Sequence, residues 1–244
     1  MGAVAAAAKR AGPAPPGPLA LATALTLATG ATNAISFFGL GGVFTSVMTG
    51  NLVLLGLSIG RYDLPLAANA AGAIIGFIVG VLGGSRVIGR AGPSHPRWGT
   101  RVALVLGAEL VLFAWMLGDW AVLSGPPTGT MRFAHGALAA LAMGAQSAVI
   151  RTFGIPGLST TFFTGTLTGV VAGLVIQHKM QWDNILLLAS VVAGAAAGGW
   201  MVVHATPAAP AIPTALLVVT LAGLHPLAVR PGRTEVHAPR SARG

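Results

Sequence analysis

The sequence predicts an all-α, multi-pass transmembrane helix bundle, and three observations support that prediction. Of the 244 residues, 54% are hydrophobic and only 8% are charged, and the mean hydropathy is +0.79. Soluble domains carry roughly 25% charged residues, so most of this chain needs an apolar solvent around it. No Asp, Glu, Lys or Arg occurs between Arg10 and Arg61 or between Asp183 and Arg230. Runs such as residues 185–203 are apolar on every side, which favours helices over the alternating strands of a membrane barrel.

Eight apolar segments follow one another along the chain. Crossing a hydrocarbon core of about 30 Å takes roughly 20 helical residues, and each segment reaches or approaches that length. The segments cover about residues 19–38, 43–60, 65–89, 101–123, 131–150, 158–177, 184–204 and 210–229. Residues 1–18 and 230–244, which are basic and rich in Ala, Pro or Gly, are predicted to be disordered tails.

Glycine and proline mark the boundaries of these segments. The first segment stops at the glycine-rich residues 39–42, and the third begins with Pro65. The remaining boundary residues are Pro93 and Pro96 before the fourth segment, Pro126 and Pro127 before the fifth, Pro156 and Gly157 before the sixth, and Pro207 and Pro210 before the eighth. The membrane domain is therefore expected to contain eight short or full-length helices.

Two internal repeats are predicted, residues 19–125 and 126–229. The block Thr-Ser-Val-Met-Thr-Gly-Asn-Leu at 45–52 recurs as Thr-Thr-Phe-Phe-Thr-Gly-Thr-Leu at 160–167, and the block at 30–34 recurs at 144–148. Small residues four apart then follow in each half: Gly72, Gly76, Gly80 and Gly84 in the first, and Ser190, Gly194 and Gly198 in the second. Such spacing puts small residues on one helix face, where we expect them to allow close helix packing within the chain or in a homo-oligomer.

The number of membrane crossings has two solutions at the level of sequence. One is eight conventional crossings with parallel repeats. In the other, the first two segments of each half make one net crossing, because one of them is a broken or re-entrant half-helix, which gives six crossings and inverted repeats. With six crossings, most of the 14 Lys and Arg residues lie on the cytoplasmic side together with both termini. The positive-inside rule favours this second solution.

Composition also excludes several functional classes. The net charge is +9, but the basic residues lie at segment ends and in the tails, so no nucleic-acid partner is expected. Because the chain has no cysteine, disulfides, thiolate catalysis and cysteine-ligated metals are excluded. The sequence has no His-x-x-x-His pair, nucleophile elbow or phosphate-binding Gly-Lys-Ser run. We therefore predict that the protein is not an enzyme and uses no metal or cofactor.

Residues 30–55 carry a family resemblance. The stretch Asn-Ala-Ile-Ser-Phe-Phe at 33–38 and the block Met-Thr-Gly-Asn-Leu at 48–52 resemble the YoaK-like family of small bacterial inner-membrane proteins, and Thr-Gly-Thr-Leu at 164–167 looks like the same family. The resemblance covers about residues 20–225 and implies a multi-pass protein of the bacterial cytoplasmic membrane, with no settled biochemical activity. The family pattern favours Asp where this chain has Asn33. An amide cannot titrate, which puts proton coupling through that position in doubt.

Hydroxyl and amide residues beside the glycine-rich breaks are the candidate substrate-binding residues. Thr45 and Thr49 share one helical face, as do Thr160 and Thr164, and the helices that begin nearby would point free N–H groups toward a bound solute. The whole candidate set is Asn33, Thr45, Thr49, Asn51, Gln146, Arg151, Thr160, Thr164 and Thr166. The alternative is that these threonines only hold helices together, with hydroxyls bonded to carbonyls.

Glu109 and His135 are the candidate residues for proton or ion coupling. Glu109 is the only carboxylate well inside an apolar segment, and a charge there would cost about 2.5–3.5 kcal/mol on insertion scales. It is therefore expected to face the bundle interior, to carry a proton, or to pair with His135 or Arg151. The alternatives are a structural hydrogen bond for Glu109 and His135, and a role as a basic interfacial anchor for Arg151.

These observations predict a permease of the inner membrane with a Thr- and Asn-lined site at the midplane, between the two repeats. Hydroxyls, amides and helix N-termini suit a small neutral or anionic solute. The runner-up is a membrane interaction or assembly protein in which the repeated blocks and glycines serve packing alone. A water-filled centre favours transport, and a dry, fully packed centre favours assembly.

Overall fold

The structure, a computed structural model, describes residues 16–89, 97–153 and 163–228, and in these ranges it contains helices and no strands. The helices are α2 (Pro16–Gly39), α3 (Met48–Arg61), α4 (Leu64–Ile88), α5 (Trp98–Leu123), α6 (Gly129–Ile150), α7 (Phe163–Gln177), α8 (Trp182–His204) and α9 (Ala211–Ala228), with two short 3-10 turns, η1 (Arg151–Phe153) and η2 (Thr206–Ala208). The predicted all-α class is confirmed. The predicted disordered tails lie almost entirely outside the described residues, and α2 starts before the tail was expected to end.

Six of the described helices are long and apolar enough to cross a membrane: α2, α4, α5, α6, α8 and α9. The other two are short, since α3 has 14 residues and α7 has 15. At 1.5 Å per residue these helices measure about 21 to 23 Å, less than the hydrocarbon core of about 30 Å. The described helices therefore fit the six-crossing solution with one half-helix in each half of the chain.

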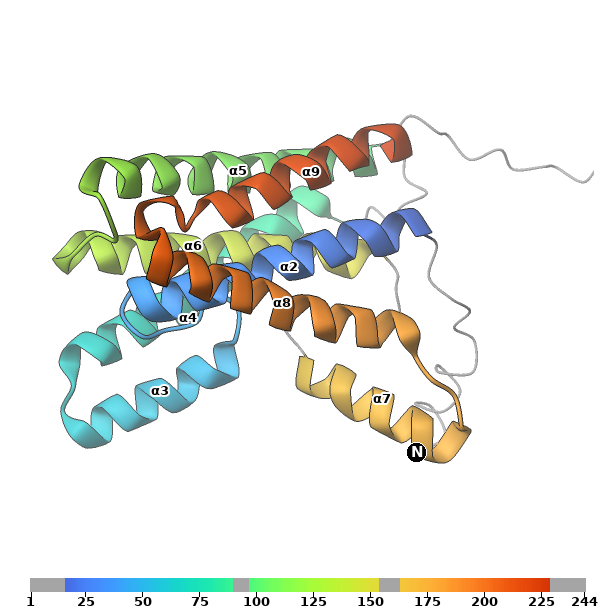
Figure 1. The fold of residues 1–244 in the computed structure, drawn as a ribbon, viewed down its shortest axis with the longest axis horizontal. Coiled ribbons are helices and arrows are strands. Elements are labelled where there is room, and N and C mark those ends of the chain that lie inside the picture. The colour runs from blue at the N-terminus through green and yellow to red at the C-terminus, as the bar shows by residue number, and fades with distance from the viewer. Residues whose placement is uncertain (1–15, 90–96, 154–162, 229–244) are drawn as a thin grey trace, which may run out of the picture.

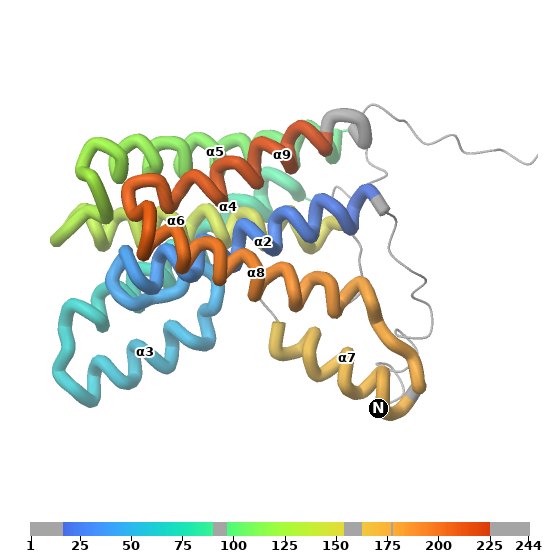
Figure 2. Tube along the Cα trace, in the orientation of Figure 1, coloured from blue at the N-terminus to red at the C-terminus, as the bar shows by residue number. Residues whose placement is uncertain are grey.

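The long helices lie side by side along the long axis of the molecule (Figure 1). Packing joins them in pairs that are distant in sequence, because α2 packs on α8, α4 on α6, and α5 on α9. The half-helices α3 and α7 lie below this layer in the view of Figure 2, each beginning near the middle of the molecule and running toward opposite ends. Helix α3 packs on α4, and α7 packs on α8.

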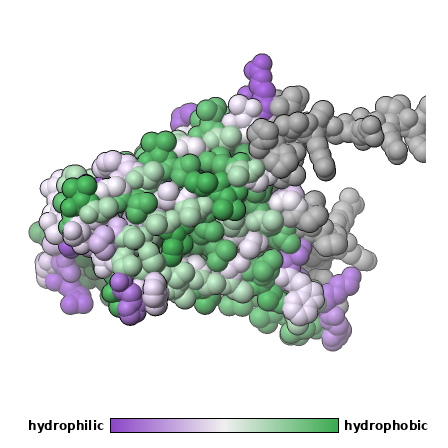
Figure 3. Space-filling model, turned by 45° about the horizontal axis from the view of Figure 1, so that its top comes forward, coloured by the Kyte–Doolittle hydropathy of each residue, from purple (hydrophilic) through white to green (hydrophobic). Residues whose placement is uncertain are grey.

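The exterior of the bundle is apolar. Figure 3 shows hydrophobic residues over the body of the molecule and hydrophilic ones gathered toward its ends. Large side chains such as Val111 and Val122 on α5, and Val218 and Val219 on α9, are more than half exposed. Apolar patches of this extent are rare on soluble monomers, and lipid would cover them. This surface confirms a multi-pass membrane protein.

Two helix contacts are close enough to require glycine. A Cβ built on these residues would collide with the backbone of the facing helix, and they are Gly76, Gly80 and Gly84 on α4 against α6, and Gly194 and Gly198 on α8 against α2. Gly72 differs, because its Cβ would meet the ring of Phe133 rather than backbone. Because these glycines have no side chain, the backbones of the paired helices come into direct contact. This is the geometry expected where small residues lie at the crossing of two membrane helices.

Local sequence explains the turn that joins the half-helix α3 to α4. Tyr62 follows α3 with φ 58°, in the left-handed region that commonly ends helices. Asp63 then caps α4, since its side chain accepts a hydrogen bond of 3.1 Å from the backbone N–H of Leu66, and Pro65 lies in the first turn, where its missing N–H costs nothing. The chain is thus reversed within two residues, and α3 and α4 form a hairpin.

Candidate functional site

Asn33 is the hub of the break between α2 and α3. Its Oδ1 accepts hydrogen bonds from the backbone N–H of Thr45 at 3.0 Å and of Ser46 at 3.1 Å, and its amide nitrogen donates to Ser46 Oγ at 2.7 Å and to Thr29 O at 3.0 Å. All these side chains are buried. Backbone that leaves a helix at membrane depth needs such internal partners, because lipid offers none. One amide therefore stabilises the non-helical backbone of the break.

Asn51 holds the same break from the other side. Its Oδ1 accepts from the N–H of Phe44 at 2.9 Å, and its amide nitrogen donates to the carbonyl of Phe44 at 2.6 Å. Both backbone groups of one residue are thus paired with one fully buried side chain from the first turn of α3. Only an amide can donate and accept in this way, so Asn51 is matched to this position.

The start of α3 itself is left without a side-chain cap. Val47 at the N-cap makes no side-chain hydrogen bond, and in the described ranges the hydroxyl of Thr49, an exposed residue, has no partner. The first N–H groups of a helix have no intrahelical acceptor, and they carry the positive end of the helix dipole. The start of α3 therefore offers donors near the middle of the molecule.

The corresponding block of the second half is only partly described. Thr160 lies outside the described residues. Thr164 is exposed in the first turn of α7, and Thr166 is buried. The hydroxyl of Thr168 donates to the carbonyl of Thr164 at 2.9 Å. The structure thus puts Thr164 and Thr166 at the start of the second half-helix, as Thr49 and Asn51 are at the start of the first.

A polar chain of contacts links α6 to the break. The amide nitrogen of Gln146 donates to Thr29 Oγ1 at 3.3 Å and to Leu25 O at 3.2 Å, and Thr29 O accepts from Asn33. The Gln146 Oε1 is buried and has no hydrogen-bond partner among the described residues. The sequence identified Asn33, Thr45 and Gln146 but missed Thr29 and Ser46, although Ser46 stands inside the repeated block. Four of these five residues come from the first half of the chain.

Glu109 lies alone in the core. It is 3% exposed, halfway along α5, and neither carboxylate oxygen has a hydrogen-bond partner in the part of the chain that the structure describes. Of the expected alternatives, Glu109 lies in the bundle interior, and it does not pair with His135 or Arg151. His135 instead approaches Asp119, which lies ten residues farther along α5, or about 15 Å along the helix axis. Arg151 is exposed just after α6, a position that suits an interfacial anchor.

Two hollows on the described surface are shallow and apolar, one over Leu167, Val171 and Val175 of α7 and the other between α2 and α8. In the described ranges, no three His, Asp or Glu side chains are grouped as metal ligands would be. The candidate site is therefore a polar region at the starts of the half-helices, in which Asn33, Asn51 and Gln146 are buried and Thr49 and Thr164 are exposed.

Comparisons with known proteins agree with the membrane fold. The family described as "Protein of unknown function (DUF1275)" matches residues 21–223. The UPF0700 transmembrane protein YoaK of Bacillus subtilis (strain 168) is 35% identical to this chain over 151 residues, which are 62% of this chain and 64% of that protein. The match thus spans less than two thirds of the relative's length. No solved structure matches the chain.

Proposed function

The chain belongs to the DUF1275 family, whose function is unknown, and on that premise we propose that it is a small-solute transporter of the bacterial cytoplasmic membrane. The proposal is supported mainly by the start of α3, where an uncapped helix N-terminus lies beside the buried Asn33 network. Broken helices whose N-termini point at a substrate near the midplane are a recurring feature of secondary transporters. Donors of this kind suit an anionic or neutral polar solute.

The packing pattern supports two inverted repeats around this site. If the two repeats, residues 19–125 and 126–229, are exchanged, α2 corresponds to α6, α4 to α8, and α5 to α9. The packed pair α4–α6 then corresponds to the packed pair α8–α2, and α5 remains paired with α9. Buried residues also match in spacing: Val102, Leu106, Glu109 and Phe113 on α5 have the same intervals as Pro213, Leu217, Thr220 and Leu224 on α9. Glu109 and Thr220 then occupy corresponding buried positions. In this arrangement the two half-helix starts lie near a pseudo-two-fold axis.

The charge of the helix ends supports an orientation with both termini in the cytoplasm. The end of the bundle that holds the starts of α2 and α5 carries, among described residues, Arg86, Arg97, Arg101, Arg151 and Lys179. The opposite end carries Arg61 and Arg132. By the positive-inside rule the first end faces the cytoplasm. Transport then runs between this basic side and the side that holds Arg132.

The residues divide into two groups in this proposal. The amide groups of Asn33 and Asn51 are already bonded to backbone, so they hold the break open as a rigid frame. The hydroxyls of Thr49 and Thr164 and the first N–H groups of α3 and α7 then contact the solute. Glu109, buried without a partner in the described ranges, binds the coupling cation, because an unpaired carboxylate at mid-membrane is costly to keep for packing alone.

Apolar surface features favour one other function. Two hollows on the described surface are shallow and apolar, and α3 and α7 expose apolar side chains, as expected of a membrane assembly protein. In the transport proposal the bundle is in an occluded state, which opens when one group of helices moves against the other. The two functions are distinguished by flux, because only a transporter carries a solute across the membrane.

Flux through the full chain in lipid vesicles tests the proposal. We expect a panel of small neutral and anionic solutes to contain at least one that crosses only in the presence of the protein. Thr49→Val should reduce that flux about 3- to 10-fold, since one hydrogen bond to the solute is lost. Thr168→Val is the matched control, because its hydroxyl is bonded within α7, and it should leave the flux unchanged. Glu109→Gln should remove the dependence of flux on an ion gradient.

Folded protein that moves no solute of the panel, or equal fluxes for Thr49→Val and the unsubstituted chain, would reject transport through this site and leave assembly as the better account. Folding of each variant is checked by circular dichroism and by its elution as a single species in detergent.

A further inference from the structure

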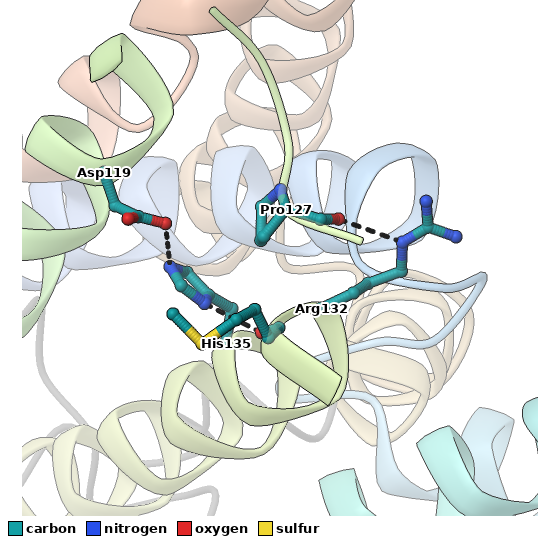
Figure 4. Close-up of polar contacts among 5 residues, drawn as sticks. Asp119, Pro127, Arg132 and His135 are labelled. Carbon is teal, nitrogen blue, oxygen red and sulfur yellow. Dashed lines mark hydrogen bonds and ion pairs between the residues drawn. The ribbon is translucent and has the colours of Figure 1, made fainter. Parts of the chain in front are cut away.

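We propose that Asp119 and His135 form a proton-binding site at the end of the bundle where α5 is followed by α6 (Figure 4). His135 is fully buried, and its Nε2 lies 3.2 Å from Asp119 Oδ2. Its Nδ1 lies 2.9 Å from the carbonyl oxygen of Met131, one turn earlier on α6. The imidazole ring is thus held between a carboxylate on one helix and a backbone carbonyl on the other.

The groups that face the two ring nitrogens of His135 determine which nitrogen binds the additional proton. A carbonyl oxygen can only accept, so Nδ1 must carry a hydrogen. Without a second hydrogen, the lone pair of Nε2 would lie near the carboxylate oxygen 3.2 Å away. A proton bound to Nε2 converts this repulsion of two acceptors into an ion pair. The two atoms lie within ion-pair distance, although the contact lacks the alignment of a hydrogen bond.

Trp115 adds a third group that favours a cationic ring. Its indole stacks on His135 with ring centroids 4.6 Å apart and an interplanar angle of 26°. Trp115 lies one helical turn before Asp119, so one face of α5 presents both an aromatic face and a carboxylate to the same imidazole. A cation over an indole is attracted by the negative face of the ring, and more strongly where water is excluded. The indole of Trp115 and the carboxylate of Asp119 both favour the protonated form of the His135 ring over the neutral form.

Other titratable groups near the pair are few. On α6 the neighbouring charge is Arg132, whose Nε donates to the carbonyl of Pro127 at 3.2 Å, and its guanidinium points away from the imidazole (Figure 4). The loop 124–128, the last turn of α2 and the turn η2, which pack at this end, contain no titratable side chain. The side chain of Asp119 is 22% exposed, whereas its Oδ2, which faces the ring, is buried.

The chain contains an internal comparison for this site. On α8, Trp200 and His204 also stack, with centroids 5.0 Å apart, but the ring is exposed, and in the described ranges no carboxylate forms an ion pair with it. His204 therefore shares the aromatic neighbour and lacks both burial and counter-charge. A role of the Asp119–His135 site in supplying the coupling proton rests on the proposed function, whereas binding of the proton does not.

Nuclear magnetic resonance of the full chain, labelled with ¹⁵N-histidine and held in lipid nanodiscs, tests the site between about pH 5 and pH 9. We expect His135 to be doubly protonated at the acid end of this range and to keep only the hydrogen on Nδ1 at the alkaline end. Trp115 fluorescence should change together with the ring. Asp119→Asn should alter this transition, because it removes the carboxylate oxygen that lies 3.2 Å from Nε2. His135→Gln should remove the transition, and His204→Gln should not alter it.

A His135 ring that stays neutral throughout, or whose transition is the same in Asp119→Asn, would overturn the site. Flux measurements separate this result from the fate of the proposed function. If the site supplies the coupling proton, Asp119→Asn and His135→Gln abolish the effect of a pH gradient on flux and retain solute exchange. Flux that keeps its full pH-gradient dependence in both variants would overturn the coupling role.

Discussion

Replacing Gly80 with leucine is expected to disrupt the bundle more than other single substitutions on α4. A Cβ at this position would collide with the carbonyl oxygen of Leu141 and approach the backbone of Ala145 on α6. Backbone cannot turn aside as a side chain can, so the two helices must separate along their contact. Overpacking commonly costs about 1–3 kcal/mol, and we expect about 3 kcal/mol or more here because the obstacle is backbone. The free energy of unfolding, followed by circular dichroism in detergent, measures the loss.

Gly83 is the matched control for this substitution. It lies three residues later on the same helix, it is exposed, and no atom of another residue would lie within 4 Å of its Cβ. Gly83→Leu adds the same side chain at the lipid-facing surface, where it should leave the unfolding free energy unchanged or raise it slightly through better helix propensity. Equal losses in the two variants would mean that α4 and α6 do not meet through Gly80.

Asn33→Leu is expected to destabilise the break before α3 by about 2–6 kcal/mol. The substitution removes the acceptor of two buried backbone N–H groups, those of Thr45 and Ser46, and leaves both without a partner. Each unsatisfied buried group costs about 1–3 kcal/mol, and lipid cannot supply a replacement. We expect α3 to lose its fixed position, seen as a lower unfolding free energy and as faster proteolysis within residues 40–47.

Thr32→Val is the control on the same helix. Thr32 precedes Asn33, is also buried, and donates only to the carbonyl of Ala28 within α2. Loss of the Thr32 hydroxyl removes one hydrogen bond within α2 and leaves no donor outside the helix without an acceptor. The free energy of unfolding should therefore fall by less than about 1 kcal/mol. Wild-type stability in Asn33→Leu would show that Asn33 does not hold the break.

The helices themselves were predictable from the sequence, and the contacts between them were not. Apolar runs separated by Gly and Pro predict eight helices, and the structure has eight in its described ranges, with ends shifted by a few residues. The four-residue spacing of Gly76, Gly80 and Gly84 predicts a packing face. It does not predict α6 as the partner, because spacing along one helix says nothing about which helix lies opposite.

The contacts of the polar residues also could not be predicted from the sequence. Asn33 and Asn51 stood out as candidates for solute binding, and in the structure their amides bond to the backbone of the break. Sequence could not foresee this, since the contacts depend on the path of residues 40–47. Asp119 was missed because a charge near a helix end resembles an ordinary interfacial anchor. The pairing of His135 with Glu109 failed because the register between α5 and α6 cannot be read from either helix alone.

We expect the chain to cross the membrane six times, because the half-helices α3 and α7 are too short to span it. Single cysteines in this naturally cysteine-free chain, labelled in intact cells with a membrane-impermeant maleimide, test it directly. Tyr62→Cys, Ser124→Cys and Lys179→Cys place the probe at exposed turns after α3, α5 and α7. Six crossings predict that Tyr62→Cys and Ser124→Cys label from outside and that Lys179→Cys labels only after the cells are opened. Labelling of all three from the same side would contradict the account and favour eight crossings.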